Sequence, residues 1–343
     1  EINNRLDEIR AMALNIYMEQ SAVRDGVTAE EVKGILLGMA SGQETLLGYF
    51  RRFIRNFEKR VGINRTVGSL RAYSNAYSHI ERFLQAQYKL SDIPFSALDR
   101  SFINKYDLYL RTERNLAPGT IINLTVQLKT IVGEAIADGI ITASPFMGYE
   151  PVRPKHVQKY LTAEELHRIM TTPLHRQTLY HVRDMFLFSC FTGIPYGDMR
   201  LLTKDNLCLA EDGIWWIKSA RQKTKIEFEI PLLDLPLQIL KKYSGTAPGD
   251  KLLPMYCNST LNLYLKEIAR ICHIDRPLVF HAGRHTYATE ITLSHGVPLE
   301  TVSRMLGHSQ IETTQIYAKV TDEKIDADTK ALNRKISERF SVV

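Results

Sequence analysis

A proline-rich stretch near the middle of the chain limits what each half can fold into. Residues 143–160, ASPFMGYEPVRPKHVQKY, contain three prolines, and no helical periodicity runs through them. Proline lacks a backbone N–H and fixes φ, so this stretch is typical of a linker. The chain's 343 residues also exceed what one hydrophobic core usually serves. We therefore predict domains over residues 46–150 and 161–343, joined by a linker over residues 151–160.

Apolar residues in the first half recur at the spacing of helices. The pattern holds in four segments with basic residues between the apolar ones: 44–62, 71–88, 93–113 and 117–141. It predicts a bundle of four or more helices. Farther upstream, Thr28 and Glu31 form a capping box that would start another helix. A basic helix face is usually solvated surface, and a DNA-facing role is the alternative.

The second half mixes helices with a small sheet. Thr162 and Glu165 form a capping box ahead of an apolar run. Helices are predicted around 180–190 and 198–202, and residues 214–232, IWWIKSARQKTKIEFEIPL, alternate as two short strands around a basic turn. The predicted fold class is therefore mainly α, with a small antiparallel β-sheet in the second domain.

Composition narrows the classes of function. The net charge of +6 and a pI near 9.0 permit a polyanionic partner without requiring one. No stretch reaches the roughly 18 apolar residues of a membrane span, and the N-terminus lacks the blocks of a signal peptide. We expect a cytoplasmic protein whose cysteines are buried free thiols, because no CxxC pair is present among Cys190, Cys208, Cys257 and Cys272.

The segment FHAGRHTYAT, residues 280–289, carries two histidines and an arginine at helical spacing. His281 and His285 could hold zinc, but a hydrolytic zinc site needs a third ligand, and Arg284 would repel the dication. Arg284 favours an anion such as phosphate instead. We therefore predict a phosphate clamp formed by His281 and Arg284, no metal and no cofactor, and interpret His285 as structural.

Residues 297–320, VPLETVSRMLGHSQIETTQIYAKV, predict two short helices. Pro298 suits the first turn of one helix, and Gly307 suits its C-terminal cap. His308 follows the cap, and Tyr317 lies nine residues later on the second helix. Either residue alone is commonly structural, but the order H-x-x-R, Gly-His, Tyr is more specific.

With these motifs, residues 46–343 resemble the tyrosine recombinase (phage integrase) family. The resemblance implies a helical core-DNA-binding domain and a catalytic domain that together form a DNA clamp. It also implies that the active site contains His281, Arg284, His308 and Tyr317. The family's catalytic lysine lies in a β-hairpin seven residues before the end of a strand, a position matched by Lys223, with Lys225 as the alternative.

One position departs from the family pattern. The family has an arginine after T-G-x and an acidic residue three positions later; here Pro195 and Asp198 stand there. Integrases of Bacteroides-type conjugative transposons also lack this arginine, and the TGIPY segment resembles theirs. Arg221 is our first candidate for a substitute, on the same strand face as Lys223, and Arg200 is the second. Both could equally be ordinary surface arginines.

The resemblance implies DNA strand cleavage and rejoining without metal or nucleotide. Tyr317 would attack phosphorus and form a 3′-phosphotyrosine, with His281 as its base. Lys223 would protonate the leaving 5′-oxygen, while Arg284 and His308 hold the nonbridging oxygens. Asp198 would orient these groups from behind.

The resemblance also implies partners. These are double-stranded DNA with attachment sites, three further protomers in a tetramer, a host DNA-bending protein and an excision factor. Residues 1–45 are interpreted as a helical coupler that follows an arm-binding domain absent from this chain. The C-terminal tail would dock on a neighbouring protomer or on its own domain through Ile325, Leu332, Ile336 and Phe340.

Two other functions compete with a site-specific recombinase of a mobile element. A type IB topoisomerase-like enzyme would share the tyrosine chemistry but act as a monomer. A catalytically silent DNA-binding protein would keep the fold after losing the arginine. Retention of Tyr317, His281, Arg284, His308 and Lys223 argues against the silent protein.

Overall fold

The computed structural model describes residues 2–21, 44–152 and 159–317, together with residues 27, 29, 32, 329–330, 332–334 and 336. The chain forms two compact units, Glu1–His156 and Val157–Val343. Among the described residues, no helix has the length and apolar character needed to cross a membrane. The capping box at Thr28 and Glu31 and the tail positions Ile325 and Phe340 lie outside the described residues.

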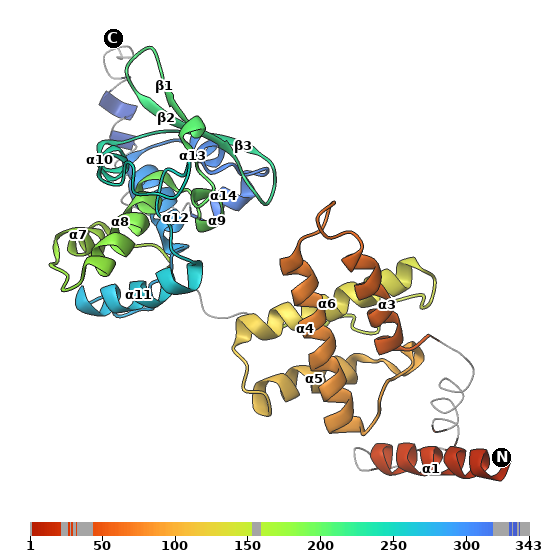
Figure 1. The fold of residues 1–343 in the computed structure, drawn as a ribbon. Helices are drawn as coiled ribbons and strands as arrows, with labels where there is room; N and C mark the ends of the chain where they lie inside the picture. Colours follow the sequence, from red (N-terminus) through yellow and green to blue (C-terminus); the bar gives the residue numbers. More distant parts are fainter. Residues whose placement is uncertain are drawn as a thin grey trace. The chain divides into compact units, whose positions relative to one another are not determined.

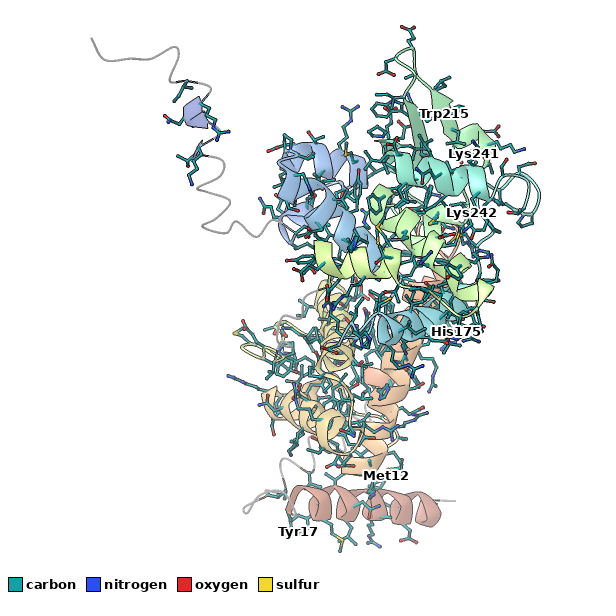
Figure 2. All side chains as sticks on the ribbon, turned by 90° about the vertical axis from the view of Figure 1, so that its left-hand side faces the viewer. Met12, Tyr17, His175, Trp215, Lys241 and Lys242 are labelled. Atoms are coloured by element: carbon teal, nitrogen blue, oxygen red, sulfur yellow. The ribbon has the colours of Figure 1, made fainter. Side chains whose placement is uncertain are left out.

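The first unit is entirely helical in its described part (Figure 1). Helix α1 leaves apolar side chains such as Met12 and Tyr17 exposed (Figure 2). The predicted bundle of four helices is confirmed. The helices of this unit are α1 (Ile2–Ser21), α3 (Leu46–Glu58), α4 (Val67–Phe83), α5 (Arg100–Thr112) and α6 (Pro118–Ala137).

The bundle closes around large apolar side chains that face inward from each helix. Phe83 on α4 packs its ring against Phe102 and Tyr106 on α5 at centroid distances of 5.3 and 5.0 Å. Asp99 caps α5 by accepting from the Phe102 N–H at 2.7 Å. The regularly spaced apolar side chains thus form the core of the bundle, and the arginines between them remain on the surface.

The second unit packs helices around α8, which is buried along most of its length. The predicted capping box is confirmed, because Thr162 and Glu165 each bond the other's backbone at the start of α7. The helices of this unit are α7 (Ala163–Thr171), α8 (Gln177–Thr192), α9 (Tyr196–Met199), α10 (Asp234–Lys242), α11 (Asn258–Ile271), α12 (Ala282–Thr286), α13 (Leu299–Leu306) and α14 (Glu312–Gln315).

A small antiparallel sheet has the order β1-β2-β3 (Leu207–Leu209, Trp215–Ala220 and Glu227–Pro231). The two predicted strands of the hairpin are β2 and β3, which pair with Ile217 opposite Ile230. Both of these isoleucines are buried, so one face of the hairpin joins the core. Trp215, at the start of β2, stays partly exposed (Figure 2).

The backbone just before α7 is hydrogen-bonded to α12. Leu161 N–H donates to Thr286 Oγ1 at 3.0 Å, and Thr286 Oγ1 itself donates to Ala282 O at 2.9 Å. Arg276 binds the Tyr160 carbonyl at 2.7 Å. The backbone before α7 is therefore held against the short helix that follows His281.

The expectation that all four cysteines are buried is wrong for two of them. All are free, but Cys257 is exposed and Cys208 is half-buried. Cys257 precedes α11, where Ser259 and Thr260 bind its sulfur and lower its pKa to about 7. A capping position lies at a helix end, and helix ends meet solvent more often than helix interiors do.

Candidate active site

Arg284 is a charged residue in the interior of the second unit. Its side chain is 3% exposed, and it donates to Gly193 O at 2.9 Å and to Leu306 O at 2.6 Å. Burial, followed by the positive charge of Arg221, lowers the pKa of Arg284 to about 10, so the guanidinium still carries its charge at pH 7. Its direct hydrogen bonds go to neutral acceptors. A buried cation of this kind is suited to receive an anion.

His308 is held in one tautomer by two neighbours. Its Nε2 lies 2.8 Å from Arg284 Nη2, and its Nδ1 lies 2.8 Å from Thr314 Oγ1. Because a guanidinium can only donate, Nε2 accepts, and the proton must sit on Nδ1. Burial, followed by the charges of Arg284 and Arg221, lowers the pKa of His308 to about 4, which keeps the ring neutral at pH 7.

Tyr317 follows α14 and turns its ring toward this pair. It is 7% exposed, and its ring lies nearly parallel to that of His308 at a centroid distance of 6.3 Å. The ring of His285 meets it edge to face at 5.0 Å. The Tyr317 hydroxyl raises the pKa of Arg284 and so offsets part of the lowering caused by burial. The phenol and the guanidinium therefore share one site.

A small apolar cluster fixes the segment that carries Tyr317. Tyr287, Val302 and Leu306 are buried with it. Gly307 ends α13 in the left-handed conformation, with φ of +63°. A Cβ at this glycine would lie 2.8 Å from Arg221 Cγ, so only glycine allows the close approach. The predicted helix–Gly–helix arrangement is confirmed, but Pro298 lies directly before α13 rather than within it, and Tyr317 lies just after the short helix α14 rather than on it.

Asp198 connects α9 to the β2–β3 turn. Its Oδ1 accepts from Gln222 N–H at 2.8 Å, and its Oδ2 lies 3.0 Å from Arg221 Nε. The second contact is an ion pair without the alignment of a hydrogen bond, because neither atom satisfies hydrogen-bond geometry. Arg221 Nη1 also reaches Leu306 O at 3.5 Å. Both Arg221 and Arg284 therefore point at the same carbonyl.

The prediction that Arg221 and Lys223 share a strand face is wrong. Strand β2 ends at Ala220, and both residues lie in the turn before β3. The chain reverses there, with Lys225 N–H bonded to Arg221 O at 2.8 Å and Lys225 at φ of +60°. The alternation of faces along a strand does not continue through such a turn.

The structure places some of the predicted site residues around Arg284 and leaves others exposed away from it. Lys223 is exposed on the turn, directly after Gln222, whose backbone N–H bonds Asp198, and Arg200 is exposed at the end of α9. The residues that lie in or beside the Arg284 cluster are Tyr317, His308, Arg221, Asp198 and, through His285, His281.

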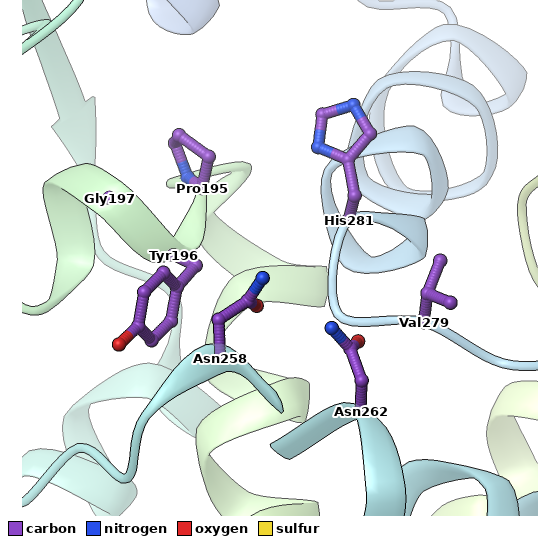
Figure 3. A pocket seen from close by; sticks show the side chains of 7 residues that line it. All are labelled: Pro195, Tyr196, Gly197, Asn258, Asn262, Val279 and His281. Atoms are coloured by element: carbon purple, nitrogen blue, oxygen red, sulfur yellow. The ribbon is translucent and has the colours of Figure 1, made fainter. Parts of the chain in front are cut away.

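A pocket of about 250 Å³ opens beside His281. Figure 3 shows Asn258 and Asn262 of α11 between Pro195 and His281. Asn262 Oδ1 accepts from Phe280 N–H at 2.7 Å, which fixes the backbone before His281. Pro195 thus borders an open space next to the cluster, where a longer side chain would have room to reach a ligand.

Sequence reasoning missed three contributors. His285, interpreted from the sequence as structural, contacts the rings of both His281 and Tyr317, at 4.9 and 5.0 Å. Thr314 Oγ1 accepts the Nδ1 proton of His308. The Leu306 carbonyl accepts hydrogen bonds from both Arg221 and Arg284. Of these three, only His285 could have been found from the sequence, because it lies four residues after His281. Backbone carbonyls and threonines have no distinctive pattern in sequence.

Gly193 should be intolerant of substitution. It ends α8 at φ of +69°, and an added Cβ would lie 2.5 Å from Tyr287 Cδ1. The left-handed conformation costs about 1–2 kcal/mol for other residues, and overpacking typically adds about 1–3 kcal/mol. We expect Gly193→Ala to lower the free energy of unfolding by the sum of both effects. Chemical denaturation of the protein would measure it.

The matched control for that change is Gly213→Ala. Gly213 has φ of +82° but no atom within 4 Å of an added Cβ. This variant should show only the conformational cost. Equal losses of stability in the two variants would contradict the predicted clash with Tyr287.

The chain has relatives among known proteins. The Phage integrase family model matches residues 159–324, and the Phage integrase SAM-like domain model matches residues 45–151. The tyrosine recombinase XerD of Listeria monocytogenes is 25% identical over 273 residues, covering 75% of this chain and 89% of the relative. XerD of Staphylococcus saprophyticus is 26% identical over 297 residues, covering 82% and 96%.

Two solved structures share the fold. The Tn1549 transposon integrase, in complex with transposon right end DNA, superposes with a TM-score of 0.66 at 18% identity, covering 84% of this chain and 99% of that one. A lambda integrase tetramer bound to a Holliday junction gives a TM-score of 0.67 at 16% identity, covering 90% and 87%. Both are complexes with DNA.

Fold and site together define a protein of the tyrosine recombinase class, whose members cleave and rejoin DNA. The two family models together span most of the chain. The chain belongs to the phage integrase family, and the predicted family is confirmed.

Proposed function

We propose that this protein is the site-specific recombinase of a mobile genetic element, which integrates and excises DNA through a 3′-phosphotyrosine intermediate. The observation that carries the proposal is the meeting of Tyr317, Arg284 and His308 in one chain. A phenol beside a buried guanidinium is a nucleophile beside a site for a phosphate. The likeness in fold to a transposon integrase supports the mobile-element context.

The proposed reaction begins when a phosphodiester displaces the internal acceptors of Arg284. The Tyr317 oxygen bonds to phosphorus, and a histidine of the H-x-x-R segment, assigned by the motif to His281, takes its proton. Lys223 gives a proton to the 5′-oxygen as the P–O bond breaks. Arg284 and His308 stabilise the nonbridging oxygens, and His308 can donate through Nε2 only after Arg284 releases that atom.

Arg221 is the proposed substitute for the arginine that Pro195 replaces. Its guanidinium contacts Leu306 O beside Arg284, and Asp198 holds its Nε. Arg200 has no such support, since its side chain is exposed at the end of α9. By holding Arg221 and Gln222, Asp198 also fixes the turn from which Lys223 projects.

The proposed domain roles follow the two units. Residues 46–150 bind core DNA, residues 161–343 carry out the chemistry, residues 151–160 link them, and residues 1–45 act as a coupler. Four protomers would act on two duplexes, assisted by a host DNA-bending protein and an excision factor. In the tail, Leu332 and Ile336 are partly exposed in this single chain and are available to dock on a neighbour.

The test of this function is covalent trapping. Duplexes that bind the protein would first be selected from a randomised pool, then nicked near the cleavage site so that the freed fragment diffuses away. A denaturing gel should show a protein–DNA adduct, and peptide mapping should place the phosphate on Tyr317. A retarded native complex with no covalent band would instead favour a silent DNA-binding protein.

Lys223→Ala should reveal the leaving-group acid. We expect cleavage of normal DNA to slow by about 10²–10⁴-fold, the usual contribution of a general acid. DNA with sulfur in place of the 5′-bridging oxygen should be cleaved at nearly the wild-type rate, since a thiolate leaves without a proton. Single-turnover rates on the selected nicked duplex would measure both.

Lys225→Ala is the matched control, because Lys225 is exposed on the same turn. It should cleave both substrates like the wild type. An equal loss on oxygen and sulfur substrates in Lys223→Ala would remove Lys223 from the acid role, and a sulfur-rescued loss in Lys225→Ala would assign that role to Lys225.

A further inference from the structure

We propose that His285 is the immediate acceptor of the Tyr317 proton, and that it passes this proton to His281. The inference rests on the proposed strand cleavage and deepens it, because it assigns a catalytic role to a residue outside the H-x-x-R motif. It also divides the role of the base between two adjacent rings. The argument depends on which rings touch Tyr317 and which ring nitrogens are already occupied.

Two histidine rings approach Tyr317, and His308 cannot take its proton. His308 Nε2 accepts from Arg284, and Nδ1 carries the proton that it shares with Thr314. Neither nitrogen has a free lone pair in this arrangement. Once phosphate displaces Arg284, Nε2 is needed as a donor to oxygen. His308 is therefore a phosphate ligand and not a base.

His285 is the other ring in contact. Its centroid lies 5.0 Å from that of Tyr317, with the two planes inclined by 68°. His285 also contacts His281, at a centroid distance of 4.9 Å and with an interplanar angle of 87°. His281 itself is exposed at the edge of the pocket that Asn258 and Asn262 line. The three rings thus form a path from the nucleophile to solvent.

Burial and the charges around His285 keep its ring unprotonated before substrate binds. Burial, then His281, Lys159 and Arg284, lower the pKa of His285 to about 4, so the ring is neutral at pH 7. A bound phosphodiester would place a negative charge at Arg284 and oppose the effect of these cations. The basicity of His285 would therefore rise when substrate is present. An anion at the site and a proton on His285 favour each other.

The proposed step balances without a cofactor. As the Tyr317 oxygen bonds to phosphorus, its proton moves to the unprotonated nitrogen of His285, which becomes an imidazolium. The P–O5′ bond breaks at the same time, and the leaving oxygen takes a proton from Lys223. His285 then returns to neutrality by giving its other ring proton to His281. Resealing runs the same transfers in reverse.

The experiment separates the base from its packing role. His285→Phe keeps a ring against Tyr317 but has no nitrogen, and we expect adduct formation on the selected nicked duplex to slow by about 10²–10⁴-fold. His285→Ala leaves a space the size of an imidazole. Added imidazole should restore much of its rate, whereas pyrazole, of the same shape but far weaker as a base, should not. DNA binding and thermal melting would be measured for each variant.

His295→Phe is the matched control, because His295 is an exposed histidine whose Nδ1 lies 2.9 Å from the Glu290 carbonyl. It should form the adduct at the wild-type rate. Wild-type rates in His285→Phe, or equal rescue of His285→Ala by imidazole and pyrazole, would overturn the proposal while leaving strand cleavage intact. If His285→Phe does not fold, the imidazole comparison in His285→Ala decides alone. Failure of the wild type to form any adduct would overturn the proposed function itself.

Discussion

Tyr317→Phe is expected to abolish the covalent protein–DNA adduct completely while leaving DNA binding unchanged. The change removes one oxygen, the proposed nucleophile, and keeps the ring. That ring packs with Tyr287, Val302 and Leu306 and meets His285 edge to face, so the cluster should stay folded. The measurement is a denaturing gel of the selected nicked duplex, beside a native gel of the same mixture.

Tyr287→Phe is the matched control for the nucleophile. Tyr287 is buried in the same cluster, and its hydroxyl contacts only the Met305 sulfur at 3.3 Å among the bonds of the described chain. This variant should form the adduct at the wild-type rate. An adduct that persists in Tyr317→Phe would refute the nucleophile assignment, and an adduct lost in Tyr287→Phe alone would transfer the role to that residue.

Arg221→Ala should lower the rate of cleavage by about 10²–10³-fold, the usual cost of removing one positioned donor to a developing oxyanion. The reason is its place beside Arg284, where both guanidinium groups reach the Leu306 carbonyl. Binding of DNA should weaken much less, because the donor acts mainly in the transition state. Single-turnover cleavage and a binding titration would separate the two.

Two further variants make that prediction specific. Arg221→Lys keeps the charge but not the planar fork, so it should recover only part of the rate. Arg200→Ala should cleave like the wild type, because Arg200 is exposed on α9. Wild-type cleavage in Arg221→Ala, with a loss in Arg200→Ala, would reverse the assignment. Melting temperatures would show whether loss of the Asp198 contact also destabilises the unit.

The sequence was sufficient for much of the helical architecture. Apolar spacing located α3 to α6 closely, and the pairing of Thr162 with Glu165 located the start of α7. These signals are local, because a helix face and a cap depend on residues three or four apart. The alternating segment likewise predicted β2 and β3, since a hairpin joins neighbours in sequence.

Only part of the candidate active site could be predicted from such local signals. The order of His281, Arg284, His308 and Tyr317 supported the family resemblance, and the comparisons confirm the family. Where Arg221 points could not be predicted, because strand alternation was assumed to continue through a turn that in fact reverses the chain. The burial of Arg284 against Gly193 and Leu306 also joins segments far apart in sequence.

By itself, the sequence determined many of the helices and the β2–β3 hairpin, and which residue types are available for phosphate chemistry. Only the tertiary structure decided which of those residues meet. It placed His285 against Tyr317, set the tautomer of His308 through Arg284, and left Arg200 exposed while Arg221 turned inward. The physical reason is that secondary structure follows from interactions between near neighbours, whereas an active site depends on long-range packing that brings distant side chains and backbone carbonyls together.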